Sequence, residues 1–306
     1  MKVAIAGGDG FIGAGVTRAL LDMGDEVMWL SYRPGSRPTP AGVTEYHFNL
    51  QEPDGEWAQA VANSDAVINL SGSNLAVRWN PETKAMLRSS RVDTARALIA
   101  AIGKARDVGK GPSAYLGACG IGIFGDRGDE ILTEESSLGS DWLSQLAQTW
   151  EQEGLAAEKV GCRAVVVRTG LVLGTVGLLP KMLLPMKLFV GGPLMPGNQW
   201  MPWIHFDDIA GIYAWATHEP NISGPINACS PNPTRSREFS RTLGQATKRP
   251  SWFPVPVFGL KLILGEVAPY MVFSQRPSVD KIVNAGYKFK YPELLPALRE
   301  AISRFK

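Results

Sequence analysis

The chain has 306 residues, of which 45% are hydrophobic and 20% are charged, as in a globular protein with one large core or a large domain and a smaller lobe. Its net charge of +2 excludes the strong positive field by which a protein recruits nucleic acid or an acidic membrane surface. We therefore expect a small molecule as the partner.

The first apolar run and the cysteines indicate the compartment. Residues 3–6 form an apolar run that is too short to be a signal peptide or a membrane span. The 3 cysteines, Cys119, Cys162 and Cys229, are odd in number, lie far apart and match no metal-ligand spacing. We expect a reduced, cytoplasmic compartment and no metal site.

Apolar runs typical of buried strands alternate with amphipathic runs typical of helices as far as about residue 170. The predicted strands are residues 3–6, 26–31, 44–48, 66–70, 114–118 and 164–169. The predicted helices are residues 13–23, 57–62, 83–105 and 141–160. This alternation is typical of right-handed βαβ units, so we predict an α/β fold whose parallel sheet is covered by helices on both faces.

A Gly-x-x-Gly-x-x-Gly turn joins the first strand to the first helix. Gly7 allows a tight turn, Gly10 lets backbone N–H groups approach phosphates, and Gly13 lets the helix lie close to the strand. Phe11 and Ile12 begin the apolar stripe of that helix, whose positive dipole end would point at the anion. The turn predicts a dinucleotide pyrophosphate site, and a strand–turn–helix without a ligand is the less favoured alternative.

The end of the second strand distinguishes NAD from NADP. An NAD site usually has Asp or Glu there, which binds the adenosine ribose hydroxyls. This chain instead has Ser31 and Arg33, a hydroxyl and a guanidinium that suit a 2′-phosphate. We therefore predict that the cofactor is NADP(H). The alternative is that Arg33 is a solvated loop residue that does not contact the cofactor.

The ends of the third and fourth strands are expected to contact the rest of the cofactor, because ligands lie at the carboxyl ends of parallel strands. We expect Asn49 and Leu50 to meet the adenine. Leu70, Ser71 and Gly72 are expected to flank the ribose and phosphate groups, although an ordinary core position for Leu70 is about equally favoured.

The pattern changes from about residue 171, because prolines and glycines divide the chain into short pieces. A further strand is expected over residues 225–229, and helices over residues 235–247 and 292–304. We therefore predict an NADP(H)-binding domain over residues 1–170. Residues 171–306 would complete the sheet and form a small cap lobe that supplies the substrate cleft.

Several segments together resemble one family over nearly the whole chain. They are GGDGFIG at 7–13, AVINLSG at 66–72, RSSRV at 88–92, GIFGDRGDE at 122–130, RTGLVLG at 168–174, WIHFDD at 203–208 and SQR at 274–276. The family is the atypical extended short-chain dehydrogenase/reductases grouped as nucleoside-diphosphate-sugar epimerases, also labelled cell-division-inhibitor-like. The resemblance implies a Rossmann-type doubly wound parallel sheet, a small C-terminal cap lobe and NADP(H) binding, with no settled substrate.

The catalytic pair of the superfamily is missing from this chain. Standard members carry Tyr-x-x-x-Lys on a helix beside the nicotinamide, where the lysine charge lowers the tyrosine pKa and allows proton exchange at neutral pH. None of the 7 tyrosines is followed by a lysine four residues later. Residues 142–151, on the helix expected to carry the pair, contain neither residue type.

The segment after the fifth strand also differs from the related family, which tends to have Ser-Ala-Ser followed by two tyrosines. This chain has Gly117, Ala118 and Cys119, and then Ile123 and Phe124. The Cys119 thiol is the proton donor that this segment retains, so it is the candidate catalytic residue. The favoured alternative is that Cys119 is simply a small buried hydrophobic residue, because a thiol is a poor hydrogen-bond donor.

Candidate substrate contacts lie in the C-terminal third. Gln199, Trp200 and Trp203 combine aromatic surface with polar tips. Arg276 offers a guanidinium for an anionic substrate group, and a salt bridge that holds the cap is about equally favoured. We interpret His205, in the same segment, as a hydrogen-bonded structural residue rather than an acid or base.

Two functions of different classes fit these observations. The first is an NADP(H)-binding oxidoreductase or epimerase-like enzyme that acts on a small molecule with non-standard groups, while the cofactor supplies the hydride chemistry. The second is a non-catalytic dinucleotide-binding sensor or regulatory protein. The missing pair favours the second function, whereas the aromatic cap favours the first, which we prefer narrowly.

Overall fold

The computed structural model describes residues 1–256, 258, 261 and 265–305. In this part of the chain, the central sheet has 7 strands in the order β11-β7-β5-β4-β1-β2-β3. All neighbours in it are parallel. The strands are β1 (Lys2–Ala6), β2 (Glu26–Ser31), β3 (Val43–His47), β4 (Ala66–Asn69), β5 (Ala114–Gly120), β7 (Arg163–Thr169) and β11 (Gly224–Ala228).

The predicted α/β fold, a Rossmann-type doubly wound parallel sheet with a C-terminal cap lobe, is confirmed. The strand predicted over residues 225–229 is β11, and it joins the sheet beside β7 with Pro225 opposite Val166. The strand order changes direction between β1 and β4, so the crevice at their carboxyl ends is where such a sheet binds its ligand. The predicted division at residues 170 and 171 stays a prediction.

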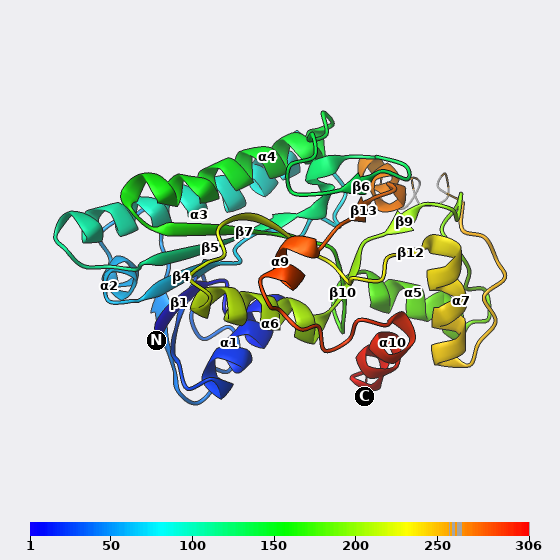
Figure 1. Cartoon of the computed structure of the whole chain (residues 1–306), viewed down its shortest axis with the longest axis horizontal. Helices are drawn as coiled ribbons and strands as arrows, with labels where there is room; N and C mark the ends of the chain where they lie inside the picture. Colours follow the sequence, from blue (N-terminus) through cyan, green and yellow to red (C-terminus); the bar gives the residue numbers. More distant parts are fainter. Residues whose placement is uncertain (257, 259–260, 262–264, 306) are drawn as a thin grey trace.

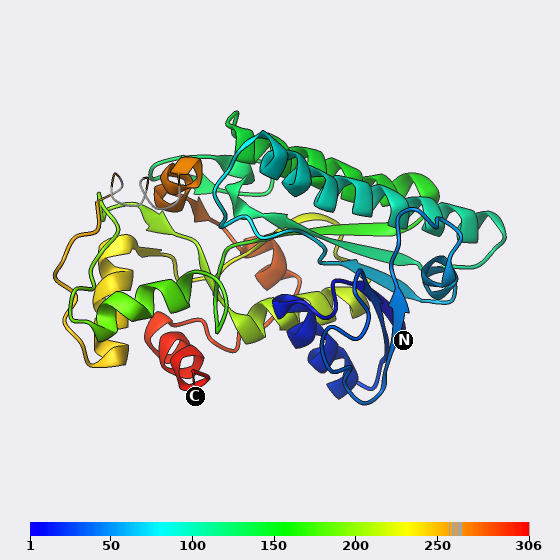
Figure 2. The same cartoon turned by 180° about the vertical axis from the view of Figure 1, so that it is seen from behind.

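Helices cover both faces of the sheet (Figures 1 and 2). Figure 1 shows α3 and α4 above the sheet and α1 and α6 below it. Asn80 and Asp141 start α3 and α4, since each side chain accepts a hydrogen bond from the N–H group three residues later. The helices around the sheet are α1 (Phe11–Asp22), α2 (Glu56–Ala62), α3 (Pro81–Asp107), α4 (Trp142–Leu155) and α6 (Phe206–His218).

The cap lobe lies at one end of the molecule, where Figure 1 shows α5, α7 and α10 close together. A separate apolar core joins them, with Leu183, Trp203, Phe239 and Leu298 among its buried residues. Short strands link the lobe to the sheet domain in the pairs β8–β10, β9–β12 and β6–β13. The elements of this part are β6 (Ile131–Leu132), β8 (Leu171–Leu173), α5 (Leu178–Lys187), β9 (Trp200–Met201), β10 (Trp203–His205), β12 (Thr234–Arg235), α7 (Ser236–Thr247), β13 (Arg276–Pro277), α9 (Asp280–Asn284) and α10 (Leu294–Ser303).

Three 3-10 helices complete the described elements: η1 (Ile121–Phe124), η2 (Ala156–Val160) and η3 (Gly265–Val272). The helix predicted over residues 141–160 is therefore α4 followed by η2. In the described ranges no helix is both long and apolar enough to cross a membrane.

A buried ion pair fixes α4 to the sheet. Arg168 of β7 donates from Nε and Nη2 to the two carboxylate oxygens of Glu151, each at 2.7 Å. The side chains of Arg168 and Glu151 are only 3% and 7% exposed. Arg168 Nη1 also donates to the Glu134 carbonyl at 3.0 Å, and the Glu134 carboxylate accepts from the N–H of Asn227 in β11 at 2.8 Å. The pair thus connects α4, β7, β11 and the segment after β6.

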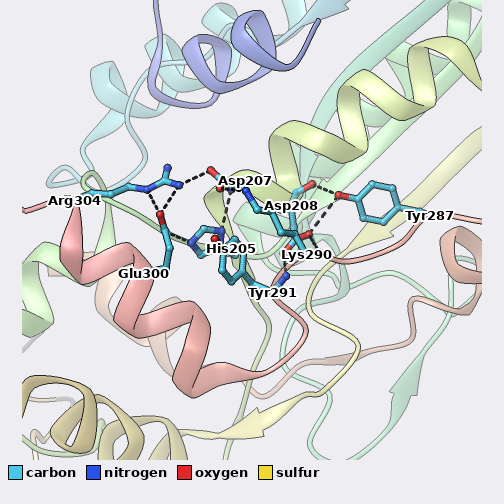
Figure 3. Close-up of polar contacts among 8 residues, drawn as sticks. All are labelled: His205, Asp207, Asp208, Tyr287, Lys290, Tyr291, Glu300 and Arg304. Carbon is cyan, nitrogen blue, oxygen red and sulfur yellow. Dashed lines mark hydrogen bonds and ion pairs between the residues drawn. The ribbon is translucent and has the colours of Figure 1, made fainter. Parts of the chain in front are cut away.

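A polar cluster fixes the C-terminal helix to the start of α6 (Figure 3). His205 Nδ1 accepts from the Asp207 N–H at 3.1 Å, so Nε2 carries the proton and donates to Glu300 of α10 at 2.7 Å. Arg304 donates at 2.7 Å to both Asp207 and Glu300. We call this set the C-terminal cluster, and it consists of His205, Asp207, Asp208, Tyr287, Lys290, Tyr291, Glu300 and Arg304.

Burial determines the protonation state of His205 in the C-terminal cluster. Burial lowers the pKa of His205 below its usual range, against the opposing effect of Asp207 and Glu300, so the neutral imidazole is favoured at neutral pH. Asp208 accepts from the backbone N–H groups of Lys290 and Tyr291 at 2.6 and 3.0 Å. These contacts agree with the interpretation of His205 as a structural residue.

We expect Glu151→Ala to lower the free energy of unfolding by about 3–5 kcal/mol, because it leaves the buried Arg168 guanidinium without its carboxylate. Glu153 is the matched control on the same helix, because its ion pair with Arg96 is partly exposed. Glu153→Ala should change the free energy by no more than about 1 kcal/mol. Urea denaturation measures both, and equal losses would contradict the role given to the buried pair.

We expect Arg304→Met to lower the free energy of unfolding by about 1–2 kcal/mol, because Asp207 and Glu300 lose a shared charged donor in a partly buried network. Arg299 lies exposed on α10, so Arg299→Met is the control and should be close to neutral. Urea denaturation and limited proteolysis of the C-terminal helix measure the effect. No difference between the two variants would show that the cluster does not hold α10.

Candidate functional site

The glycine turn lies at the tip of β1, against the end of β4. Gly7 has a φ of 80°, and its carbonyl accepts the Gly10 N–H at 3.0 Å. A Cβ at Gly13 would lie 2.2 Å from the Gly7 oxygen, so only glycine allows this approach of helix and turn. The first N–H groups of α1, from Phe11 and Ile12 onward, have no intrahelical partner and suit an anion.

The tip of β2 carries the residues predicted to choose the cofactor. Ser31 is 1% exposed, and its Oγ has no hydrogen-bond partner among the described residues. Arg33 lies exposed in the loop that follows. The sequence interpretation missed Arg37, which reaches back to the turn and donates to the Asp9 carbonyl at 2.7 Å. Glu45 of β3 is also near, and its carboxylate accepts from the Gly35 N–H and the Thr39 hydroxyl.

The other predicted cofactor contacts lie at the tips of β3 and β4. The Asn49 side chain is engaged locally, since it donates to Glu52 and accepts from the Gln51 N–H. Leu50 and Leu70 are partly buried and pack against the two cores beside the sheet.

At the tip of β4, Ser71 is buried, and its Oγ has no partner in the described part of the chain. A Cβ at Gly72 would lie 3.1 Å from the Arg91 Cζ atom, so this glycine makes room for the guanidinium. The structure thus gathers the predicted residues around one crevice, and their cofactor roles stay predictions.

A pocket of about 320 Å³ opens at the carboxyl ends of β5 and β7. Its floor is formed by residues 120–122 and 169–171, and one wall is formed by α4. The opposite wall comes from the cap lobe, through α5, β9 and η3. Segments far apart in the sequence therefore meet here, and their side chains are mostly apolar.

The face of α4 that lines the pocket has no acid or base. It presents Leu143, Leu146, Ala147 and Trp150, two pairs spaced four residues apart as the missing Tyr-x-x-x-Lys would be. Among the described residues that line the pocket, none is Asp, Glu, His or Cys. The ionisable lining groups are Arg91, Lys181 and Tyr270.

Cys119 lies under this wall and is not part of the pocket lining. It is 3% exposed, and its thiol donates to the Ala147 carbonyl, with 3.5 Å between the heavy atoms. Burial raises the pKa of this thiol well above its usual range, so it stays protonated at neutral pH. The contacts match the alternative of a small buried residue, and a catalytic role for Cys119 stays a prediction.

Two of the predicted substrate residues lie within the cap lobe and are not part of the pocket lining. Gln199 is buried, donating to the Leu194 carbonyl and accepting from the Gly197 N–H. Trp203 is 1% exposed within the cap core.

The other two lie next to one another. Trp200 lines the pocket, and its indole N–H donates to Asp129 at 2.8 Å. Arg276 lies outside the pocket lining, with its guanidinium 4.6 Å from the Trp200 ring centroid. Sequence reasoning missed Arg91, Trp150 and Tyr270 as pocket residues, because nothing in their local sequence indicates which side chains meet across the crevice.

His205, Asp207 and Glu300 of the C-terminal cluster lie close enough together to ligate one cation. Figure 3 shows, however, that these groups already bind one another and Arg304. Both imidazole nitrogens are engaged, and the guanidinium neutralises both carboxylates. The contacts among these residues therefore hold α10 in place.

The sequence matches two family models. One, described as the NAD dependent epimerase/dehydratase family, covers residues 3–229. The other, a domain of unknown function named DUF1731, covers residues 255–301. The chain is 36% identical over 304 residues to the epimerase family protein YfhF of Bacillus subtilis, which spans 99% of this chain and 98% of that protein. It is 33% identical over 311 residues to the human epimerase family protein SDR39U1, spanning 99% of this chain and 100% of that protein.

Comparison with solved structures indicates the same family as the sequence comparisons. The crystal structure of human SDR39U1 with NADPH has a TM-score of 0.85 and 31% identity, covering 100% of both chains. A nucleoside-diphosphate sugar epimerase from Corynebacterium glutamicum has a TM-score of 0.78 and 29% identity, covering 99% of this chain and 58% of that one. The predicted resemblance is confirmed: the chain belongs to the NAD-dependent epimerase/dehydratase family, as an atypical extended short-chain dehydrogenase/reductase similar to SDR39U1.

Proposed function

We propose that this protein binds NADP(H) and uses it to reduce or oxidise a small molecule held in the pocket between the sheet and the cap lobe. The observation that carries the proposal is the pocket itself, about 320 Å³ and walled by both parts of the chain. A protein that only holds a dinucleotide has less need of a mostly apolar cavity that a cap lobe closes over the strand ends.

Three observations support NADP(H) as the cofactor. The turn from Gly7 to Gly13 has the close approach that a pyrophosphate site requires. At the tip of β2, Arg33 and Arg37 lie in the loop beside the buried Ser31 hydroxyl, which itself is near enough to the Glu45 carboxylate to help lower its pKa. The related human protein was crystallised with NADPH.

Reduced nicotinamide supplies a hydride, so reduction of a carbonyl also requires a proton donor. Among the described lining residues, the Tyr270 phenol and the Lys181 ammonium group can donate a proton. Lys181 is exposed, whereas Tyr270 is partly buried beside Trp79, with 5.1 Å between the ring centroids. We assign the role of donor to Tyr270, because its phenol is the partly buried hydroxyl acid of the lining and is protonated at neutral pH. Burial raises the pKa of Tyr270, which makes the phenol a weaker acid than a free tyrosine.

The second candidate function is a non-catalytic dinucleotide sensor. It is favoured by Leu143 and Ala147, which leave the pocket face of α4 without an acid or base. On this alternative the pocket would bind a ligand, and the cofactor would report redox state without turnover.

We expect Arg33→Ala to weaken NADPH binding about tenfold or more and to change NADH binding little, because only NADPH carries the 2′-phosphate. Arg18 lies exposed on α1, so Arg18→Ala is the control with the same loss of charge. Nucleotide titrations followed by nicotinamide fluorescence give the affinities. Equal losses for the two nucleotides would overturn the choice of NADP(H).

Turnover is tested by following NADPH absorbance with a panel of aliphatic and aromatic aldehydes and ketones. We expect oxidation with at least one class, and a drop of about 10²-fold or more in kcat for Tyr270→Phe with unchanged NADPH affinity. NADPH binding without oxidation by any compound would favour the sensor. Normal turnover in Tyr270→Phe would remove Tyr270 from the mechanism and leave the rest of the proposal in place.

A further inference from the structure

Two arginines are buried in the described part of the chain, and their surroundings differ. Arg168 is 2% exposed and makes a bidentate ion pair with Glu151. Arg91 of α3 is 6% exposed, and no carboxylate of the described residues pairs with it. The residues outside the described ranges add no acidic side chain. Within the described residues, therefore, no carboxylate balances the charge of Arg91.

Arg91 is held in place by neutral groups. Nη1 donates to the Leu87 carbonyl at 3.0 Å, and Nη2 donates to the Ser73 carbonyl at 2.9 Å. The guanidinium lies over the Trp150 ring, 5.0 Å from its centroid. These contacts orient the group but supply no negative charge, and Nε has no hydrogen-bond partner among the described residues. Burial lowers the pKa of Arg91 to about 10, so it is still a cation at neutral pH.

The Arg91 guanidinium, which has no carboxylate partner among the described residues, lies at the pocket. It lines the pocket together with Trp150, whose indole Nε1 is buried and has no partner among the described residues. Burying an unpaired charge costs several kcal/mol, so a group kept in that state has a use other than stability. An anion in the pocket would complete the coordination of both donors.

The rest of the lining limits what the anion is attached to. Leu75, Leu143, Leu146 and Val267 surround the space, and no carboxylate of the described lining accepts from sugar hydroxyls. A nucleotide sugar would bury many hydroxyl and amide groups without partners, which is costly. An apolar body fits this lining better.

We propose that the pocket binds a small molecule with an apolar body and one anionic oxygen group, a carboxylate or a phosphate, and that Arg91 pairs with this group. The proposal deepens the proposed function, because it rests on that function for placing the molecule beside the nicotinamide. The guanidinium also lies next to Gly72 at the β4 tip, so the phosphates of the cofactor are the other source of such an anion.

The experiment compares three probes by calorimetry, with and without saturating NADPH: 4-phenylbutyrate, its neutral analogue 4-phenylbutanol, and UDP-glucose. We expect the carboxylate to bind about tenfold tighter than the alcohol, with UDP-glucose weaker than both. Arg91→Gln should reduce carboxylate binding to the level of the alcohol and leave the NADPH affinity within about threefold. Arg88→Gln, an exposed arginine on the same helix, should leave all affinities unchanged.

Several results would overturn the proposal. Equal binding of the acid and the alcohol, or binding of neither, would contradict the proposed pairing of Arg91 with an anionic group. A loss in Arg91→Gln confined to NADPH would identify the cofactor phosphates as the partner of Arg91. Tight UDP-glucose binding that depends on Arg91 would replace the apolar acid with a nucleoside diphosphate. A wild-type protein that prefers the carboxylate but fails to bind NADPH would contradict the proposed function and leave this inference standing.

A second variant separates a binding role from a structural one. If the charge of Arg91 serves a ligand, Arg91→Met should leave the urea midpoint of the ligand-free protein unchanged or raise it, because an unbalanced buried charge is removed. Arg168→Met should lower the midpoint, because it strands Glu151. A fall in Arg91→Met as large as that in Arg168→Met would make Arg91 a structural residue and overturn the proposal.

Discussion

The ion pair between Arg168 and Glu151 is the interaction on which the pocket depends. It joins the C-terminal half of α4 to β7, and its geometry is bidentate, which fixes the orientation of the helix as well as its distance. Trp150 and Ala147, on the same helix, form a wall of the pocket. Loss of either partner would leave the other charge buried without compensation, which is strongly destabilising. The packing of the pocket wall and the stability of the sheet therefore depend on the same ion pair.

The same helix explains how the chemistry of this chain has diverged from standard short-chain dehydrogenases. The fold keeps the helix beside the strand ends, but the positions that face the pocket are apolar. Ionisable groups reach the cavity from other elements, with Arg91 on α3, Lys181 on α5 and Tyr270 on η3. In this chain, therefore, the ionisable groups of the pocket come from elements other than the helix beside the strand ends.

Much of the fold could be predicted because its signals are local. The glycine turn, the apolar strands and the amphipathic helices each depend on neighbouring residues, and the alternation of strands and helices restricts the topology to a parallel sheet. The strand at 225–229 was predictable for the same reason, and the structure places it as β11. The cofactor candidates came from a positional rule, since the tips of parallel strands meet at one edge.

The pocket residues could not be found in that way. Arg91, Trp150 and Tyr270 come from three elements whose packing is set by long-range contacts, and Trp203, a plausible substrate residue from its sequence, is buried in the cap core. The sheet, the glycine turn and the absence of the Tyr-x-x-x-Lys pair follow from the sequence, because each is a matter of local geometry or residue identity. Which side chains face the cavity, and which buried arginine has no carboxylate partner among the described residues, follows from the fold, because burial and pairing depend on residues far apart in the chain.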